Sequence, residues 1–226
     1  MKKILTIAGV LSASVIASHA SVVWTGATNN DFYNDANWDF SGAVNGTTAI
    51  NPSTDINEDL VISGAARLTG GGRLDLGAGY SITLTNSSFA PNSGVNGLVD
   101  GDPSNSVLNV LGGSSMTSTW VTEGMTLNVD GTSSYTLRGA GDPINSQSEK
   151  TTINLTPGAQ LTLTSVAEFT EQGADIMVNG VSFATDNSIL TFSGNTATAV
   201  GTAIPEPSGI ALIGLAGLAM ILRRRK

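Results

Sequence analysis

The stretches "SVLNVLGGSSMT" (residues 106–117) and "MTLNVDGTSSYTL" (residues 125–137) decide the fold class. In each of them apolar and polar residues alternate, a glycine marks a turn, and a second short alternating segment follows, which is the pattern of β-strands joined by tight turns. The stretch "TTINLTPGAQLTL" (residues 151–163) repeats it, and no part of the body has the i, i+3, i+4, i+7 spacing of an amphipathic helix. We therefore predict an all-β body.

Six such segments form a weak repeat with steps of 22, 26, 19, 26 and 23 residues between equivalent points, which are Leu60, Ile82, Leu108, Leu127, Ile153 and Ile176. In a β-solenoid each repeat is one coil, and each coil buries its inward residues against the next coil. The repeat predicts a right-handed parallel β-solenoid (β-helix). A β-sandwich or jelly roll is the alternative, because it also contains many short strands separated by turns. The irregular spacing and the shortage of aromatic residues favour the solenoid.

The alternation in these segments also predicts which side chains face inward. The inward set is apolar and comprises Leu108, Val110, Leu127, Val129, Ile153, Leu155, Leu161 and Leu163. Asn109, Asn128 and Asn154 occupy matching outward positions in three of the repeats. These three amides either hydrogen-bond to one another along the stack or point at solvent.

The N-terminus has the features of a secretory signal peptide. Lys2 and Lys3 precede an apolar run over residues 4–17, and Ser18-His19-Ala20 forms a small-x-small cleavage site. A membrane anchor is the alternative, but the apolar run is shorter than the roughly 18 residues of a stable span. We expect residues 1–20 to be removed and the mature chain to begin near Ser21.

Composition limits the chemistry of the mature chain. His19 is the only histidine and leaves with the signal peptide, and the chain contains no cysteine. This excludes an imidazole base, a thiolate nucleophile, a His/Cys zinc site and disulfides. Residues 21–204 contain 17 acidic and four basic residues, a net charge of −13, which disfavours binding to nucleic acid. An acidic surface serves solubility, and calcium binding is the minor alternative.

Two acidic loops resemble metal or catalytic sites only in composition. The segments "VDGDPSN" (residues 99–105) and "GAGDPINSQSE" (residues 139–149) lack the Asp-x-Asp-x-Asp-Gly pattern of a calcium loop, and ordinary turn chemistry accounts for both. Asp100 and Asp102 could form the carboxylate pair of a glycosidase, but a body with so few cations suits an anionic polysaccharide substrate poorly. We therefore predict no catalytic residues, no cofactor and no enzyme activity.

The start of the mature chain, residues 21–64, resembles the opening segment of bacterial β-helical surface proteins and of chains similar to autotransporter passengers. The resemblance lies in Trp24, Gly26, the Asn37-Trp38 pair, and the Asp-Leu-Val-Ile strand at residues 59–62. It implies that an aromatic segment (residues 21–58) precedes the β-coils (residues 59–202).

Two interpretations of the aromatic segment follow. Trp24 and Trp38, beside Phe32, Tyr33 and Phe40, could close the exposed end of the solenoid. Alternatively, Trp24 and Trp38 could form a glycan-binding platform, because exposed aromatic rings stack on sugars. The cap is favoured, because large aromatic side chains are usually buried.

The chain ends in "AIPEPSGIALIGLAGLAMILRRRK" (residues 203–226). The uncharged run over residues 209–222 would form a helix about 21 Å long, which is shorter than the roughly 30 Å hydrocarbon core of a bilayer. The prolines Pro205 and Pro207 separate this short hydrophobic helix from the body. The terminal cations, which stay on the cytoplasmic side of a membrane, are Arg223, Arg224, Arg225 and Lys226.

Together the Pro205-Glu206-Pro207 signature, the apolar helix and the basic terminus closely resemble the PEP-CTERM sorting signal of Gram-negative bacteria. The resemblance implies transient insertion of a transmembrane helix in the inner membrane, cleavage near the signature by an exosortase, and display at the cell surface or release. It also implies an association with exopolysaccharide and biofilm. We therefore expect a non-catalytic structural or adhesive protein of the surface or extracellular matrix; the alternative is a carbohydrate-binding or carbohydrate-cleaving surface protein.

Overall fold

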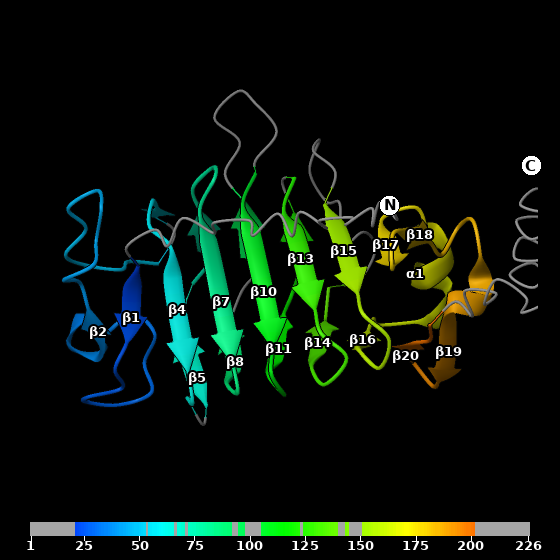
Figure 1. Cartoon of the computed structure of the whole chain (residues 1–226), viewed down its shortest axis with the longest axis horizontal. Helices are drawn as coiled ribbons and strands as arrows, with labels where there is room; N and C mark the ends of the chain where they lie inside the picture. Colours follow the sequence, from blue (N-terminus) through cyan, green and yellow to red (C-terminus); the bar gives the residue numbers. More distant parts are fainter. Residues whose placement is uncertain are drawn as a thin grey trace, which may run out of the picture.

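A computed structural model describes residues 21–52, 54–65, 67–70, 72–91, 95–97, 105–122, 124–139, 143–144 and 151–201. These residues form a β-solenoid of about four turns, so the predicted solenoid is confirmed over the sandwich (Figure 1). The predicted signal peptide and the predicted C-terminal helix lie outside the described residues, as do residues 99–104, 140–142 and 145–149 of the two acidic loops.

Three sheets form the sides of the solenoid. Sheet A has nine strands: β1 (Val22–Trp24), β2 (Trp38–Asp39), β4 (Leu60–Ser63), β7 (Ser81–Thr85), β10 (Val107–Leu111), β13 (Thr126–Val129), β15 (Thr152–Leu155), β17 (Ile176–Val178) and β18 (Val181–Ser182). Sheet B has seven: β5 (Leu68–Gly70), β8 (Ser88–Pro91), β11 (Ser115–Ser118), β14 (Ser134–Leu137), β16 (Gln160–Thr162), β19 (Leu190–Ser193) and β20 (Thr196–Ala199). Sheet C has four: β3 (Asp55–Ile56), β6 (Leu74–Leu76), β9 (Val95–Gly97) and β12 (Val121–Thr122).

The chain visits the three sheets in turn. In Figure 1 the sheet A strands in front run downward while successive coils advance to the right, which makes the coil right-handed as predicted. The strands of sheet A pair in parallel from β1 through β4 to β17. The register aligns every equivalent point that the repeat predicted and adds Val22 from β1: Val22, Leu60, Ile82, Leu108, Leu127, Ile153 and Ile176.

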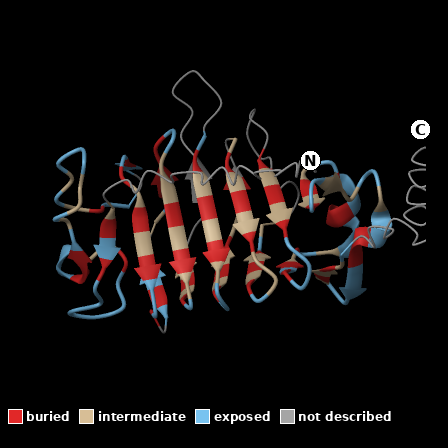
Figure 2. Cartoon of the chain, in the orientation of Figure 1, coloured by how far each residue is buried: buried red, intermediate tan, exposed pale blue. Residues whose placement is uncertain are grey.

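The core lies inside the coils. Along β7, β10, β13 and β15 buried and half-buried residues alternate, as Figure 2 shows. All eight predicted inward side chains are at most 2% exposed. Burial of an aliphatic side chain of this kind contributes roughly 1.5–3 kcal/mol to folding.

Buried serines stabilise the corner between sheets A and B. The Ser87 hydroxyl accepts the Ala65 N–H (3.2 Å), the Ser114 hydroxyl accepts the Ser87 N–H (3.1 Å), and the Ser133 hydroxyl accepts the Ser114 N–H (3.1 Å). Each corner N–H therefore bonds to a hydroxyl of the next coil, so a buried donor is not left unpaired. These serines are the first residues of the Ser-Ser doublets in the repeats.

The aromatic segment closes the N-terminal end. β1 adds to sheet A in parallel, and β2 then pairs with β1 in the antiparallel sense. The rings of Trp24 and Trp38 meet edge to face at 5.2 Å, and Phe32 contacts Trp38 at 5.2 Å and stacks on Phe89 at 4.7 Å. Near the end of this segment (residues 21–58), β3 pairs in parallel with β6, so it forms part of sheet C of the solenoid.

The C-terminal end differs from the continuous coils that the sequence predicts. After β16 the chain forms a short helix, α1 (Val166–Glu171), and β19 and β20 then return as an antiparallel pair. β20 pairs with β16 in the antiparallel sense. The Glu168 carboxylate accepts the Thr164 N–H (3.0 Å) and so ties the first turn of the helix to the segment before it, while the N-cap residue Ser165 makes no capping hydrogen bond through its side chain. Six residues are too few to show a helical period, which is why the helix was not predicted.

Candidate functional site

Three asparagines form a ladder on the outer face of sheet A. The register of β10, β13 and β15 places Asn109, Asn128 and Asn154 side by side. The Asn128 amide donates to Asn109 Oδ1 (2.9 Å), and the Asn154 amide donates to Asn128 Oδ1 (3.0 Å). The Asn109 amide continues the chain by donating to the hydroxyl of Thr83 (3.1 Å). Of the two alternatives that the sequence left open, the structure shows hydrogen bonding along the stack.

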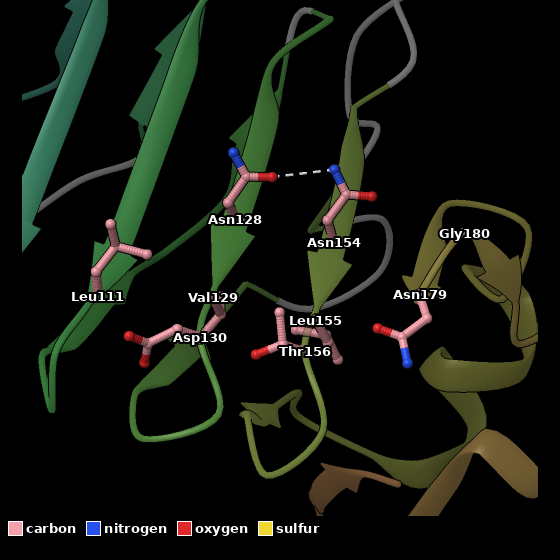
Figure 3. Close-up of a pocket in the computed structure, with 9 residues that line it drawn as sticks. All are labelled: Leu111, Asn128, Val129, Asp130, Asn154, Leu155, Thr156, Asn179 and Gly180. Carbon is pink, nitrogen blue, oxygen red and sulfur yellow. Dashed lines mark hydrogen bonds between the residues drawn. The ribbon is translucent and has the colours of Figure 1, made fainter. Parts of the chain in front are cut away.

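A groove of about 290 Å³ lies at the C-terminal end of this ladder (Figure 3). The two-residue turn between β17 and β18 forms its outer wall, where Asn179 (φ 50°) and Gly180 (φ 80°) adopt the left-handed conformation of a type I′ hairpin turn. The lining combines amides, a carboxylate and a hydroxyl with apolar residues: Leu111, Asn128, Val129, Asp130, Asn154, Leu155, Thr156, Asn179 and Gly180.

Asp130 is the one carboxylate among the described residues that line this groove, and its oxygens are already engaged. Oδ2 accepts the Gly112 N–H (2.6 Å), and Oδ1 accepts the Ser133 hydroxyl (2.7 Å) and both the hydroxyl and N–H of Thr132 (2.8 and 3.1 Å). Partial burial raises the pKa of Asp130, but the hydrogen bonds from Gly112, Ser133 and Thr132 outweigh burial, and the pKa is lowered. The carboxylate therefore fixes the turn between sheets A and B.

The exposed lining of the groove is largely apolar, with amide and hydroxyl groups among the apolar residues. Amide and hydroxyl groups both donate and accept hydrogen bonds, and Leu111 adds an apolar contact. Among the residues that the structure describes, no three His, Cys, Asp or Glu side chains gather closely enough to hold a metal ion.

The two tryptophans proposed for glycan binding lie in the cap, at the opposite end of the solenoid from the groove (Figure 1). Trp24 is 8% exposed and Trp38 is 6% exposed, and the Trp38 indole N–H donates to the Phe32 carbonyl (2.7 Å). Stacking on a sugar needs an exposed ring face, which such burial does not provide. Both ring systems are therefore buried within the aromatic segment. Asp100 and Asp102 lie outside the described residues, as do all residues of the predicted sorting signal.

A second groove, on the outer face of sheet B, was missed by the sequence analysis. Its volume is about 280 Å³, and its lining residues are Arg67, Thr69, Ala90, Pro91, Thr117, Ser118, Thr119 and Arg138. Arg67 and Arg138 precede and follow strands that are far apart in the sequence, so no local motif connects them. The signal that could have found them is the outward position of both residues once the coil register is known.

Comparisons with known proteins give information on the C-terminal tail alone. Neither curated proteins nor solved structures give a match to the chain. In the described part of the chain, no helix has both the length and the apolar character needed to cross a bilayer. Residues 203–226 match the family model of the PEP-CTERM protein-sorting motif. The match confirms the predicted sorting signal and implies an exported surface protein that an exosortase processes after a membrane-anchored transit state.

Proposed function

We propose that this protein is a non-catalytic structural or adhesive component of the cell surface or extracellular matrix. The observation that carries the proposal is the combination of a β-solenoid whose outward polar groups form ordered ladders with a C-terminal sorting motif. A stack of hydrogen-bonded coils forms an extended surface whose side chains are held in a fixed arrangement. Such a surface is suited to repeated contacts with a matrix polymer.

Three turn carboxylates are poorly suited to act as general acids. A general acid needs a raised pKa near the working pH. The hydrogen bonds from the Ser41 N–H lower the pKa of Asp39, and those from the Ser188 hydroxyl and N–H lower the pKa of Asp186. Like Asp130, these carboxylates are held ionised by donors of their own turns, which suits them to stabilising loops.

Carbohydrate binding is the second candidate function, and the groove beside the asparagine ladder favours it. Asn128, Asn154, Asn179 and the Thr156 hydroxyl line one surface, and amides and hydroxyls are the groups that bind sugar hydroxyls. In this proposal the glycan is uncharged, because none of the described residues that line the groove is cationic.

A deletion strain tests the main proposal. Cells that lack the protein should lose surface attachment or matrix cohesion, and the wild-type chain should restore it. A chain with Pro205, Glu206 and Pro207 changed to Ala should not restore it, because it cannot be sorted. Unchanged attachment in the deletion strain, or release of new reducing ends when the purified protein is mixed with matrix polysaccharide, contradicts a non-catalytic structural role.

Mass spectrometry of the mature extracellular protein tests the processing step separately. We expect a C-terminus near Pro205-Glu206-Pro207, with residues 210–226 missing. The intact tail on released protein would exclude cleavage by an exosortase. Removal of the four terminal cations should cause mis-sorting, because each contributes about 1 kcal/mol at an anionic membrane surface.

A further inference from the structure

The groove on sheet B concentrates positive charge on an otherwise acidic body. Residues 21–204 have only four cations against 17 acidic residues, and two of the four, Arg67 and Arg138, line this groove. Both side chains are exposed, and neither forms an ion pair with the residues that the structure describes. Arg73, in contrast, is bound to the buried carboxylate of Asp75 (2.5 Å).

The strand register explains how the two arginines share one surface. Thr69, Ala90, Thr117 and Thr136 align across β5, β8, β11 and β14, so alternation places Arg67, two residues before Thr69, and Arg138, two residues after Thr136, on the same outward face. These four strands span three interstrand spacings, about 14 Å along the solenoid axis.

The floor between the arginines is rich in hydroxyl groups. Thr69, Thr117 and Thr119 contribute hydroxyls, and Ala90 leaves room between them. The Thr117 side chain is half-buried and Thr69 is exposed, so a ligand lying across the strands can reach both. The groove thus combines two guanidinium groups near its ends with small polar side chains in the middle.

We propose that this groove binds the carboxylate groups of an acidic polysaccharide. A guanidinium group presents a planar fork of N–H donors that matches a carboxylate in a bidentate pair. The threonine hydroxyls between the arginines favour a polyhydroxylated chain over an acidic peptide. A ligand that crosses several strands of a flat sheet must be extended, as a polysaccharide chain is.

Because the body has a strong net negative charge, an acidic polysaccharide can bind only at a specific local site. An acidic protein repels polyanions, so non-specific attraction cannot produce the binding. Affinity for an acidic polysaccharide must then come from a local site. The site would supply a binding partner for the proposed adhesive role, and to that extent the inference rests on the proposed function. Binding is measured on purified protein, whereas the adhesive role is measured on cells. Either proposal can therefore fail without the other.

The test measures the affinity of the purified exported chain for polygalacturonate, with dextran as the neutral polysaccharide and polyglutamate as the acidic peptide. Arg67→Gln combined with Arg138→Gln should weaken polygalacturonate binding at least tenfold, and each single change should weaken it about threefold. Lys150→Gln, which removes one unit of positive charge at a different position in the sequence, is the control for each single change and should change the affinity less than twofold. Circular dichroism and thermal unfolding check that each variant is folded.

Two further readouts complete the test. Arg67→Lys combined with Arg138→Lys keeps the charge but loses the bidentate geometry, so its affinity should fall between those of the wild type and the Gln double variant. Unchanged affinity in the folded Gln double variant would overturn the proposal. Equal affinity for dextran and polygalacturonate would also overturn it, because binding would then not depend on carboxylate groups. Tighter binding to polyglutamate than to polygalacturonate would overturn it as well, because the ligand would then be an acidic peptide.

Discussion

The middle coils and the N-terminal cap are stabilised in different ways. In the coils from β7 to β15, an aligned apolar residue inside and an aligned polar residue outside recur, and a buried serine recurs at the corners after β7, β10 and β13. In the cap each contact occurs once. Phe32 packs against Trp38 and Phe89, and the buried Glu58 carboxylate accepts the N–H groups of Val44 (2.9 Å) and Asn45 (2.6 Å).

This difference indicates where a mutation should lower the stability of the fold most. A lost contact in a coil leaves equivalent contacts in the coils above and below, whereas a lost contact in the cap has no equivalent. The cap also covers the first coil, which would otherwise expose its core and its strand edges. We therefore expect equal losses of buried surface to be more damaging in the cap than in the coils.

The largest effect is expected for Phe32→Ala. This substitution leaves a cavity where the Phe32 ring contacts Trp38, Tyr33 and Phe89, and it should lower the free energy of unfolding by about 3–5 kcal/mol. Urea unfolding measures the change, with the exposed Val44→Ala as the control expected to stay within about 0.5 kcal/mol. A smaller loss for Phe32→Ala than for Leu127→Ala in a coil would contradict the proposed sensitivity of the cap.

The next effect is expected for Glu58→Gln in the cap. Glutamine keeps the size of the side chain but has one acceptor oxygen, so either the Val44 or the Asn45 N–H loses its partner. Loss of a hydrogen bond to a buried charged group should cost about 1.5–3 kcal/mol in the same unfolding measurement. Glu171→Gln, at the exposed end of α1, is the matched control and should have little effect.

A smaller effect is expected for Asn128→Ala in the coils. The variant removes both hydrogen bonds of the central ladder residue, but the flanking asparagines are half-exposed and can bond to water. We expect a loss of about 1 kcal/mol. The control is Thr126→Ala, an outward change on the same strand; an equal loss in both variants would mean that the ladder adds nothing beyond the strand preference of the side chain.

The smallest effect is expected for Asp130→Asn, and it should depend on pH. Since hydrogen bonds lower the folded pKa of Asp130 below its unfolded value, near 3.9, the carboxylate stabilises the fold above that value. The stabilisation is lost as the pH falls through the folded pKa. Because the group is largely solvated, the difference from wild type at pH 7 should be below about 1 kcal/mol.

Urea unfolding at pH 7 and at pH 3 measures the Asp130 effect. The difference in the free energy of unfolding between the wild type and Asp130→Asn should be smaller at pH 3 than at pH 7. The difference for Asn128→Ala, which removes no titratable group, should not narrow in this way. A gap that is constant with pH would mean that the Asp130 charge does not stabilise the turn.

The sheet A strands were predictable because their signal is local. Strands β4, β7, β10, β13 and β15 contain alternating residues over four or five positions, and Leu108, Leu127 and Ile153 begin this pattern in three coils with an asparagine next in line. The alternation predicted which side chains are buried, and the shared position of the asparagines predicted that they align. The hydrogen bonds between the amides required the three-dimensional register, so the sequence left that point open.

Other parts had no comparable signal. The strands of sheet C are two or three residues long, which is too short for alternation, and all three residues of β6 are buried. The arginine groove brings together Arg67 and Arg138, whose separation in the chain hides their common face. The tail was recognised because its signature, apolar run and basic end are consecutive in the sequence.

The parallel register of the coils has a consequence for the size of the protein. Because β7, β10, β13 and β15 meet their neighbours in the same alignment, any one of them could adjoin any other without a new kind of contact. A whole coil could therefore be duplicated or lost while both ends keep their own closing elements. The distance between the two ends would change in steps of about 4.8 Å, the spacing between strands. Evolution could in this way adjust how far the molecule reaches from its point of attachment by changing the number of coils.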